Sequence, residues 1–442
     1  MNKFFRWYFK TSLILRIIVC FIAGSVIGGI LWYISNTAAF SPADVLMPYI
    51  SPFGTVFVHM LKMIVVPIIF FSLVVGAASL PVAKFGRIGL KTVLWYLACS
   101  LLAAVVGTSL AMLLNPGSGT GLDLWQEMAG NSVFQAEEMA QTTGAAGTLS
   151  QLLFNLFKNP FEALATGNFL PIIVFSVMFG LAIRISIEAS PGGKKAARLE
   201  MLEDFLKACR DAMFKVVDWI LEYSPIGVLA LTIMNFGLYG PKIVGPYISV
   251  TLGVVFGIIL MVFVVYPALL LVVTRRNPFL ILKRIDEAMI MAFITRSSAA
   301  TLPVSIKTAE EQLKIRSELA SFSLPLGATI NMDGVCVHLP MFAVLAANIF
   351  GIDLTPSRLI ILVITTVLAS IGAGGVPGGS LMLLFIILET MGLTANQVSV
   401  IVALALGINP ILDMFETMNN VTGDLVCTYA VAHNEGLIEP NS

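Results

Sequence analysis

Acidic and polar side chains recur inside an apolar segment near the end of the chain, residues 405–432. The five residues follow one another at intervals of three, one, three and four: Asp413, Glu416, Thr417, Asn420 and Asp424. On a helix these intervals place all five side chains on one face. Carboxylate and amide oxygens bind small hard cations, and a buried carboxylate suits an ammonium group. The spacing therefore indicates a site for cations and a charged small molecule.

The same stripe would also suit the wet face of a cytosolic amphipathic helix. Composition favours a membrane instead, because 57% of the 442 residues are hydrophobic and only 12% are charged. A carboxylate at membrane depth is energetically expensive and is functional by default. We therefore expect a polytopic integral membrane protein with a working site near the middle of the bilayer.

Charge and metal-binding residues exclude several other classes of protein. Lysines plus arginines equal aspartates plus glutamates at 26 each, so no basic surface suggests a nucleic-acid partner. The cysteines lack zinc-type spacing and are interpreted as small buried hydrophobes: Cys20, Cys99, Cys209, Cys336 and Cys427. The histidines are too scattered for a metal cluster and are interpreted as packing or interfacial residues: His59, His338 and His433.

Hydropathy and charge predict six spans before the chain becomes irregular. They are expected at about 13–34, 46–80, 92–114, 152–185, 212–236 with a break at Pro225, and 248–273. The loop at 80–91 is basic, whereas the loop at 117–150 has no Lys or Arg. By the positive-inside rule the first loop is cytoplasmic and the second external, which puts both termini in the cytoplasm, with a bacterial inner membrane as the expected location.

Two later segments are polar at their centres. Residues 278–308 and 358–393 each consist of two apolar arms, and each arm is too short to cross a core that takes about 20 residues. We expect two re-entrant helical hairpins whose tips meet at a site, because irregular backbone at membrane depth must be buried or line a cavity. Each hairpin precedes a polar-centred helix, which indicates an inverted repeat.

The first polar-centred helix, residues 317–350, carries Thr329, Asn331 and Asp333 at alternate positions, which does not fit one helical face. An unwound turn there would offer the carbonyls of Gly327 and Asn331 and the Asp333 carboxylate to a cation. Packing by small residues would explain the glycine but not the aspartate.

The hairpin tips are candidates for binding an anionic group. Ser298 and the backbone near Val376 would present a hydroxyl and helix N-terminal amides to a carboxylate. Arg296 would either neutralise a carboxylate of the last helix or contact substrate. Asp413 suits an α-ammonium group, and Asp424 a second cation. The run GAGGVPGGS lacks the GK[ST] ending of a phosphate loop, so nucleotide binding is not expected.

Four motifs together resemble the dicarboxylate/amino acid:cation symporter family, which has the glutamate-transporter fold. They are TRSSAATLPVS (295–305), LPLGATINMDG (324–334), GAGGVPGGS (372–380) and ILDMFETMNNVTGD (411–424), and the resemblance covers essentially the whole chain. It implies an all-α polytopic protein with eight transmembrane helices, two hairpins and inverted repeats. It also implies a homotrimer of elevator type, in which the scaffold is mainly 11–80 and 150–236 and the transport part mainly 81–115 and 243–433.

The resemblance also implies site residues. Substrate contacts would fall at Ser298, Val335, Val376, Asp413, Glu416, Thr417 and Asn420. One sodium site would use Gly327, Asn331, Asn420 and Asp424; a second would use carbonyls of Thr329, Ser370, Ile371 and Ala373 beside Met332. A third would use Tyr96, Cys99, Ser100, Asn331 and Asp333.

Departures from the family pattern bear on the substrate. Members that carry aspartate or glutamate have Arg where this chain has Glu416, and Thr where it has Val335. Glu416 would repel an acidic side chain, so dicarboxylate transport is disfavoured. The serine/threonine carriers of the family are similar here, and we expect a small neutral amino acid such as serine, threonine or alanine. A basic amino acid or cystine is the alternative.

Other departures bear on the coupling ion. Cys99 replaces a Thr hydroxyl ligand, and sulfur is a poor partner for sodium. Asn409 stands where acidic-substrate members often have Asp. Because Asp333 and Asp424 persist, sodium coupling is expected ahead of proton coupling, with the stoichiometry left open.

An enzyme and a channel are the two other function classes for an apolar chain with buried carboxylates. An enzyme is not expected, because the GxGD signature of an intramembrane aspartyl protease and the GxSG nucleophile of a serine protease are both missing. A channel is disfavoured by closed hairpins around a midplane site, although some family members also pass anions. Saturable uptake that depends on an ion gradient would separate a carrier from a channel.

Overall fold

The computed structural model describes residues 11–37, 42–78, 86–118, 157–166, 169–371, 373, 375 and 378–439. Within these ranges the ordered elements are helices, apart from one isolated β-bridge between Ile315 and Ile438. Eight of the described helical segments are long and apolar enough to cross a membrane. A membrane offers the backbone no water to bond, so spanning segments must satisfy their own N–H and C=O groups as helices. The expected all-α polytopic class is confirmed.

The first part of the chain forms five long helices and one short helix, α7 (Pro160–Thr166), within the described residues. The long helices are α2 (Leu13–Thr37), α3 (Pro42–Ala78), α4 (Gly86–Leu114), α8 (Phe169–Glu188) and α9 (Lys194–Tyr239). A short 3-10 turn, η1 (Gly240–Ile243), then leads to a membrane-length segment made of α10 (Val244–Leu260), a π turn η2 (Met261–Val265) and α11 (Tyr266–Thr274). The predicted acidic loop at 117–150 lies almost entirely outside the described residues.

The last part of the chain is more interrupted. Its elements are α12 (Pro278–Arg284), α13 (Asp286–Thr295), α14 (Ser298–Lys307), η3 (Thr308–Gln312), α15 (Ser317–Ile330), α16 (Asp333–Phe350), α17 (Pro356–Ser370), α18 (Gly379–Thr390) and α19 (Ala395–Asn434). Two helical hairpins are present, α13 with α14 and α17 with α18, close to the predicted ranges.

The predicted break at Pro225 is wrong, because α9 continues through it for 46 residues. A proline cannot donate to the carbonyl four residues before it, here that of Leu221. The Ser224 hydroxyl donates to this carbonyl instead, at 2.6 Å. Packing against α2, α3 and α8 also supports the long helix. A neighbouring serine and tertiary contacts therefore compensate for the missing N–H.

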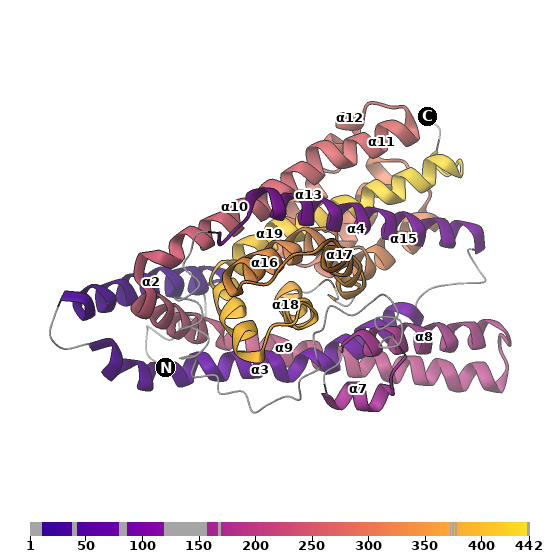
Figure 1. Ribbon diagram of the computed structural model, residues 1–442. Coiled ribbons are helices and arrows are strands. Elements are labelled where there is room, and N and C mark those ends of the chain that lie inside the picture. Colours follow the sequence, from indigo (N-terminus) through magenta and orange to yellow (C-terminus); the bar gives the residue numbers. More distant parts are fainter. Residues whose placement is uncertain are drawn as a thin grey trace.

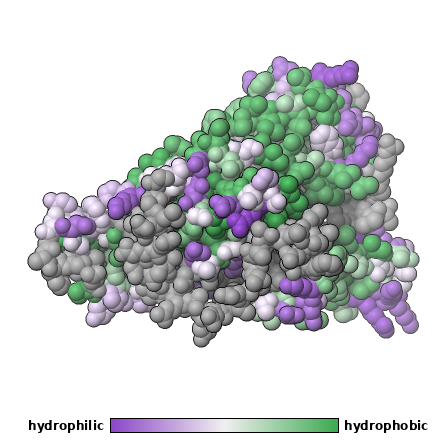
Figure 2. Space-filling model, in the orientation of Figure 1, coloured by the Kyte–Doolittle hydropathy of each residue, from purple (hydrophilic) through white to green (hydrophobic). Residues whose placement is uncertain are grey.

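The helices form two groups (Figure 1). In one group α3 packs on α8, and α9 packs on α2 and α3; in the other α4, α10 and the hairpin helices pack around α16 and α19. In the most apolar stretch of each membrane-length segment, 89% of the residues of Ser317–Phe350 are buried and 78% of those of Gln397–Asn434. The corresponding share in Leu15–Thr37 is 22%. The two polar-centred helices are therefore enclosed by protein, whereas the first span faces outward. Figure 2 shows a broad hydrophobic surface over the second group.

The tips of the two hairpins meet, as predicted. The Ser297 hydroxyl, between α13 and α14, donates to the Gly375 carbonyl between α17 and α18, at 2.9 Å. The Ala299 amide donates to the same carbonyl at 3.4 Å. The described tip residues Ser297, Ala373 and Gly375 are non-helical and buried, which is the condition for irregular backbone at membrane depth.

The segment after α19 returns to the exit of the first hairpin. Ile438 forms the β-bridge with Ile315, the Arg316 amide donates to the Leu437 carbonyl at 3.0 Å, and the Glu439 amide donates to the Lys314 carbonyl at 2.8 Å. The last described residues are thus hydrogen-bonded to the segment between η3 and α15.

Candidate functional site

The polar stripe on α19 is buried. The helix starts with a capping box, in which Thr394 and Gln397 bond each other's backbone, and runs unbroken to Asn434. All five predicted side chains project from its buried part, and each residue is at most 4% exposed: Asp413, Glu416, Thr417, Asn420 and Asp424. An enclosed stripe of this kind needs partners inside the protein.

The predicted unwound turn lies between α15 and α16. Asn331 and Met332 have ψ angles of 84° and 59°, outside the helical range. The break frees the Gly334 amide, which donates to the Asn420 side-chain oxygen at 2.7 Å. A Cβ on Gly334 would lie 2.4 Å from the Glu416 carbonyl oxygen, so α16 and α19 approach this closely only because the residue is glycine.

Oxygen atoms gather on one side of this break. The Asn331 amide donates to Asp424 Oδ1 at 3.0 Å, and a Cβ at Gly327 would lie 2.5 Å from the same oxygen. Asn331 Oδ1 is buried and has no hydrogen-bond partner among the described residues. Three of the four residues predicted for the first sodium site thus lie together, and Asn420 bonds the same break. The donor set of carboxylate, amide and carbonyl oxygens fits a hard cation.

Asp333 lies at the N-terminus of α16 and is fully buried. Its two oxygens accept hydrogen bonds from Ser100 at 2.8 Å and from Tyr266 at 2.7 Å. Ser100 and Asp333 were predicted for the third sodium site. Tyr266 was not, because a tyrosine inside an apolar span carries no local signal of its partner 67 positions away.

Tyr96 and Cys99, predicted for the same site, contact residues of α15 and α19. Tyr96 Oη bonds the carbonyl and hydroxyl of Ser323, at 2.9 and 2.7 Å, and lies 3.3 Å from the Thr428 hydroxyl. Cys99 Sγ lies 3.3 Å from Cys427 Sγ. Its contact is therefore with another sulfur rather than with an oxygen-rich cluster. The sequence did not predict Ser323 and Thr428 as site residues, although Thr428 is one helical turn beyond Asp424.

The residues predicted for the second sodium site lie where the second hairpin tip meets the end of α15. Ser370 ends α17, Ile371 is its C-cap, and the Ala373 amide donates to the Ser370 carbonyl at 3.1 Å. A Cβ at Gly375 would lie 2.4 Å from the carbonyl of Ala328, the neighbour of Thr329. Met332 Sδ accepts from the Asn420 amide at 3.3 Å. Val376 lies outside the described residues.

Asp413 joins the hairpins to α19. Its Oδ2 lies 3.7 Å from Arg296 Nη1 and accepts from the Gly378 amide at 3.2 Å. The Thr417 hydroxyl donates to the Asp413 carbonyl at 2.8 Å. Of the two roles considered for Arg296, the structure shows the pairing with a carboxylate of the last helix.

The tip of the first hairpin has the predicted features of an anion site. Ser297 caps α14 by accepting from the Ala300 amide at 3.2 Å, so Ser298 stands in the first turn of the helix. The Ser298 hydroxyl is buried and makes no hydrogen bond within the described ranges. A free hydroxyl at a helix N-terminus suits a carboxylate.

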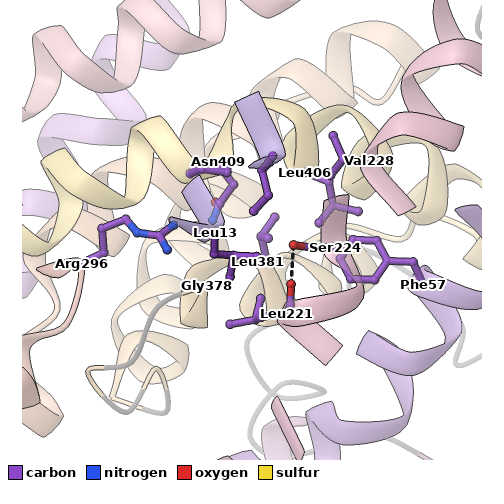
Figure 3. A pocket seen from close by; sticks show the side chains of 12 residues that line it. Leu13, Phe57, Leu221, Ser224, Val228, Arg296, Gly378, Leu381, Leu406 and Asn409 are labelled. Carbon is purple, nitrogen blue, oxygen red and sulfur yellow. Dashed lines mark hydrogen bonds between the residues drawn. The ribbon is translucent and has the colours of Figure 1, made fainter. Parts of the chain in front are cut away.

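A pocket opens beside this tip, between the two groups of helices. Arg296, Gly378 and Asn409 line it from one side, and Ser224 and Phe57 from the other. Figure 3 shows the Arg296 side chain extending toward Gly378 and Asn409. Asn409, noted as a departure from acidic-substrate members, thus shares this pocket with Arg296.

His338 has a partner that the sequence did not reveal. Its Nδ1 is in hydrogen-bond contact with Glu416 Oε1, and both side chains are buried. The interpretation of His338 as a packing residue is therefore incomplete. Two residues 78 positions apart give no spacing signal, and the contact arises from the α16–α19 packing.

Comparisons with known proteins give a consistent result. The model of the sodium:dicarboxylate symporter family matches residues 13–434. The proton/glutamate-aspartate symporter of Escherichia coli (strain K12) is 32% identical over 428 residues, covering 96% of this chain and 93% of that protein. The proton/sodium-glutamate symport protein of Geobacillus stearothermophilus is 31% identical over 428 residues, covering 97% and 95%. The excitatory amino acid transporter 3 of Homo sapiens is 31% identical over 418 residues, covering 84% and 76%.

Proposed function

The chain belongs to the sodium:dicarboxylate symporter family, whose members are transporters and not enzymes, and from this premise we propose that it imports a small neutral amino acid together with sodium. Serine, threonine and alanine are the proposed substrates. The family membership establishes a multi-pass secondary symporter coupled to a cation. The amino acid and the ion are the proposal.

Glu416 carries the choice of substrate. It is buried one turn from Asp413, and the guanidinium of Arg296 lies against that same Asp413. The side-chain carboxylate of an acidic substrate would lie near Glu416. Two like charges brought together in this way cost on the order of several kcal/mol. Two of the relatives are named for glutamate or for glutamate and aspartate, whereas Glu416 and Val335 argue for a different side chain in the substrate of this chain.

The main-chain groups of an amino acid fit the remaining residues. Asp413 would receive the α-ammonium group, since a buried ligand charge needs an opposite charge. The Ser298 hydroxyl, the N-terminus of α14 and the backbone at Val376 would receive the α-carboxylate. Arg296, Thr417 and Asn420 complete the proposed contacts, with Val335 beside the substrate side chain.

Sodium is the proposed coupling ion. We propose three sodium sites. The first is centred on Asp424 and the third on Asp333. The second is formed by the carbonyls of Thr329, Ser370, Ile371 and Ala373. The cluster of Asn331, Asp424 and Gly327 supports the first of them most directly, because it contains an unpartnered buried oxygen. The relatives' names include both proton and sodium, so a proton-coupled carrier is the second candidate.

The two groups of helices suit a division into a fixed scaffold and a moving transport part. We propose that residues 11–80 and 150–236 form a scaffold that holds a homotrimer together, and that residues 81–115 and 243–433 move across the membrane as an elevator. Both termini are proposed to be cytoplasmic, in a bacterial inner membrane.

Uptake of radiolabelled serine into proteoliposomes under an inward sodium gradient tests the proposal. Unlabelled alanine should compete and aspartate should not. Competition by lysine or cystine alone would instead favour a carrier of basic amino acids or cystine. If only a proton gradient drives uptake, the coupling ion is the proton and not sodium. Inhibition by aspartate would refute the role of Glu416 in excluding acidic substrates.

A further inference from the structure

His338 and Glu416 form a buried pair between the two polar-centred helices. His338 stands on α16, one turn after Gly334, whose missing side chain allows α16 to approach the α19 backbone at Glu416. His338 Nδ1 and Glu416 Oε1 are in hydrogen-bond contact. The contact is thus a product of the same close helix packing that forms the substrate end of the site.

Packing fixes the imidazole ring from the other side. The His338 ring stacks on Phe342, one turn further along α16, with ring centroids 4.8 Å apart. A stacked, fully buried ring has little freedom to turn away from its hydrogen bond. His338 therefore holds one oxygen of Glu416 in a defined position.

The second oxygen of the carboxylate has no partner. Glu416 Oε2 is buried and accepts no hydrogen bond from the described residues. A buried acceptor left unsatisfied is costly and rare, so its partner is expected to arrive from elsewhere. Asp413, one turn before Glu416 on α19, is itself paired with Arg296.

We propose that His338 is a positioning residue that presents Glu416 Oε2 to the substrate side chain, so that the site selects amino acids whose side chain ends in a hydrogen-bond donor. This inference rests on the proposed import of neutral amino acids. The hydroxyl of serine or threonine satisfies Oε2, whereas the methyl group of alanine leaves it buried and unpaired. Among the proposed substrates the hydroxy amino acids are therefore preferred to alanine.

The size of the preference follows from the chemistry of a site built around a hydrogen bond. Such sites discriminate strongly against an analogue that lacks the bonding group, because their own polar atoms are then left unpaired. We expect serine to bind at least about tenfold more tightly than alanine, the factor expected from losing one hydrogen bond to a charged group.

Competition against radiolabelled serine in proteoliposomes measures this preference as the ratio of the inhibition constants of alanine and serine. His338→Phe keeps a ring against Phe342 but removes the donor, and should bring the ratio to within about threefold, mainly by weakening serine binding. His338→Asn retains an amide donor near the position of Nδ1 and should restore most of the ratio. Phe342→Leu removes the ring that holds the imidazole but keeps the Nδ1 group, so the ratio should fall, although less than in His338→Phe.

Three results would overturn the inference. They are a wild-type ratio near one, an unchanged ratio in His338→Phe, and equal weakening of serine and alanine in that variant. Each leaves the neutral carrier intact. If the wild-type protein shows no sodium-dependent uptake of any neutral amino acid, the proposed function itself has failed, so the two failures are distinguishable.

Discussion

Nη1 of Arg296 lies 3.7 Å from Oδ2 of Asp413, and the Gly378 amide donates to the same oxygen at 3.2 Å. One carboxylate on α19 thus contacts both hairpins. Because the charge of Asp413 is partly balanced before any ligand arrives, its burial is less expensive. An α-ammonium group that pairs with Asp413 would release the guanidinium toward the α-carboxylate of the same substrate.

Replacing Asp413 by Asn should abolish amino-acid binding. The change removes the charge that pairs with the ammonium and leaves Arg296 unpaired, a loss of about 3–5 kcal/mol for a buried pair. Serine affinity, measured by scintillation proximity on purified protein, should fall at least about a hundredfold. Asp218→Asn alters an exposed aspartate on α9 and is the matched control. Normal binding in Asp413→Asn would contradict the assignment.

Changes at two positions should move the substrate preference toward aspartate, and a change at a third position should strengthen the shift. Glu416→Arg with Val335→Thr supplies a cation and a hydroxyl for a second carboxylate. The new guanidinium would face the His338 imidazole, which now contacts Glu416. Adding His338→Phe removes the ring nitrogens and with them this competition for hydrogen bonds. We expect aspartate to inhibit serine uptake in the double variant and at least about threefold more strongly in the triple variant, a difference of about 0.7 kcal/mol.

No inhibition by aspartate in either variant would show that selectivity is determined elsewhere. Glu416→Gln with Val335→Thr is the control, because it removes the negative charge without adding a positive one.

Asp424→Asn should weaken sodium binding. The Asp424 carboxylate contacts Asn331 and supplies the negative charge of the oxygen cluster beside Gly327. Losing one charged ligand should raise the sodium concentration for half-maximal uptake at least about tenfold, in line with the strength of a charge-assisted contact. Asp353→Asn, at an exposed position before α17, should have no effect. If both variants show the same sodium dependence, the ion is held elsewhere.

Cys99→Thr should strengthen the third sodium site. Cys99 Sγ now lies 3.3 Å from Cys427 Sγ, and a hydroxyl would add an oxygen ligand on the turn of α4 that carries Ser100. Since sodium prefers oxygen to sulfur, uptake should saturate at a lower sodium concentration, by about threefold or more. Cys427→Ala removes the neighbouring sulfur without adding oxygen and should not reproduce the effect. An unchanged sodium dependence in Cys99→Thr would leave this site without a role.

Gly334→Ala should destabilise the protein. The new methyl group would lie 2.4 Å from the Glu416 carbonyl oxygen, and overpacking of this kind costs about 1–3 kcal/mol. Gly245 is also the second residue of a helix, α10, but has open space around its Cβ position, so Gly245→Ala should be nearly neutral. Thermal unfolding in detergent compares the two. Equal melting temperatures would mean that α16 and α19 can separate here without loss.

Much of the architecture could be predicted because its signals are local. Apolar runs mark the long helices, and polar centres mark the hairpins and the break at Asn331. The motif residues could be found for the same reason: the stripe from Asp413 to Asp424 follows the helical repeat. Pro225 shows the limit of local rules, since the Ser224 hydroxyl that satisfies the Leu221 carbonyl is visible only in the folded helix.

The missed site residues share a different property. Tyr266 reaches Asp333, Ser323 reaches Tyr96, and His338 reaches Glu416 across 67, 227 and 78 positions of sequence. Each contact depends on the distance between two helices and on the rotation of each about its axis. Hydrophobic patterning determines which face is buried, but it does not specify which polar atoms meet on that face.

The bridge between Ile315 and Ile438 attaches the segment after α19 to the segment that follows the first hairpin. An affinity tag or fluorescent protein fused directly after Glu439 would pull on backbone that is hydrogen-bonded to Lys314. A flexible spacer would separate such a cargo from this segment. Truncation before Leu437 would leave the Arg316 amide without its acceptor, so shortened versions of the protein would report on hairpin stability as well as on the tail.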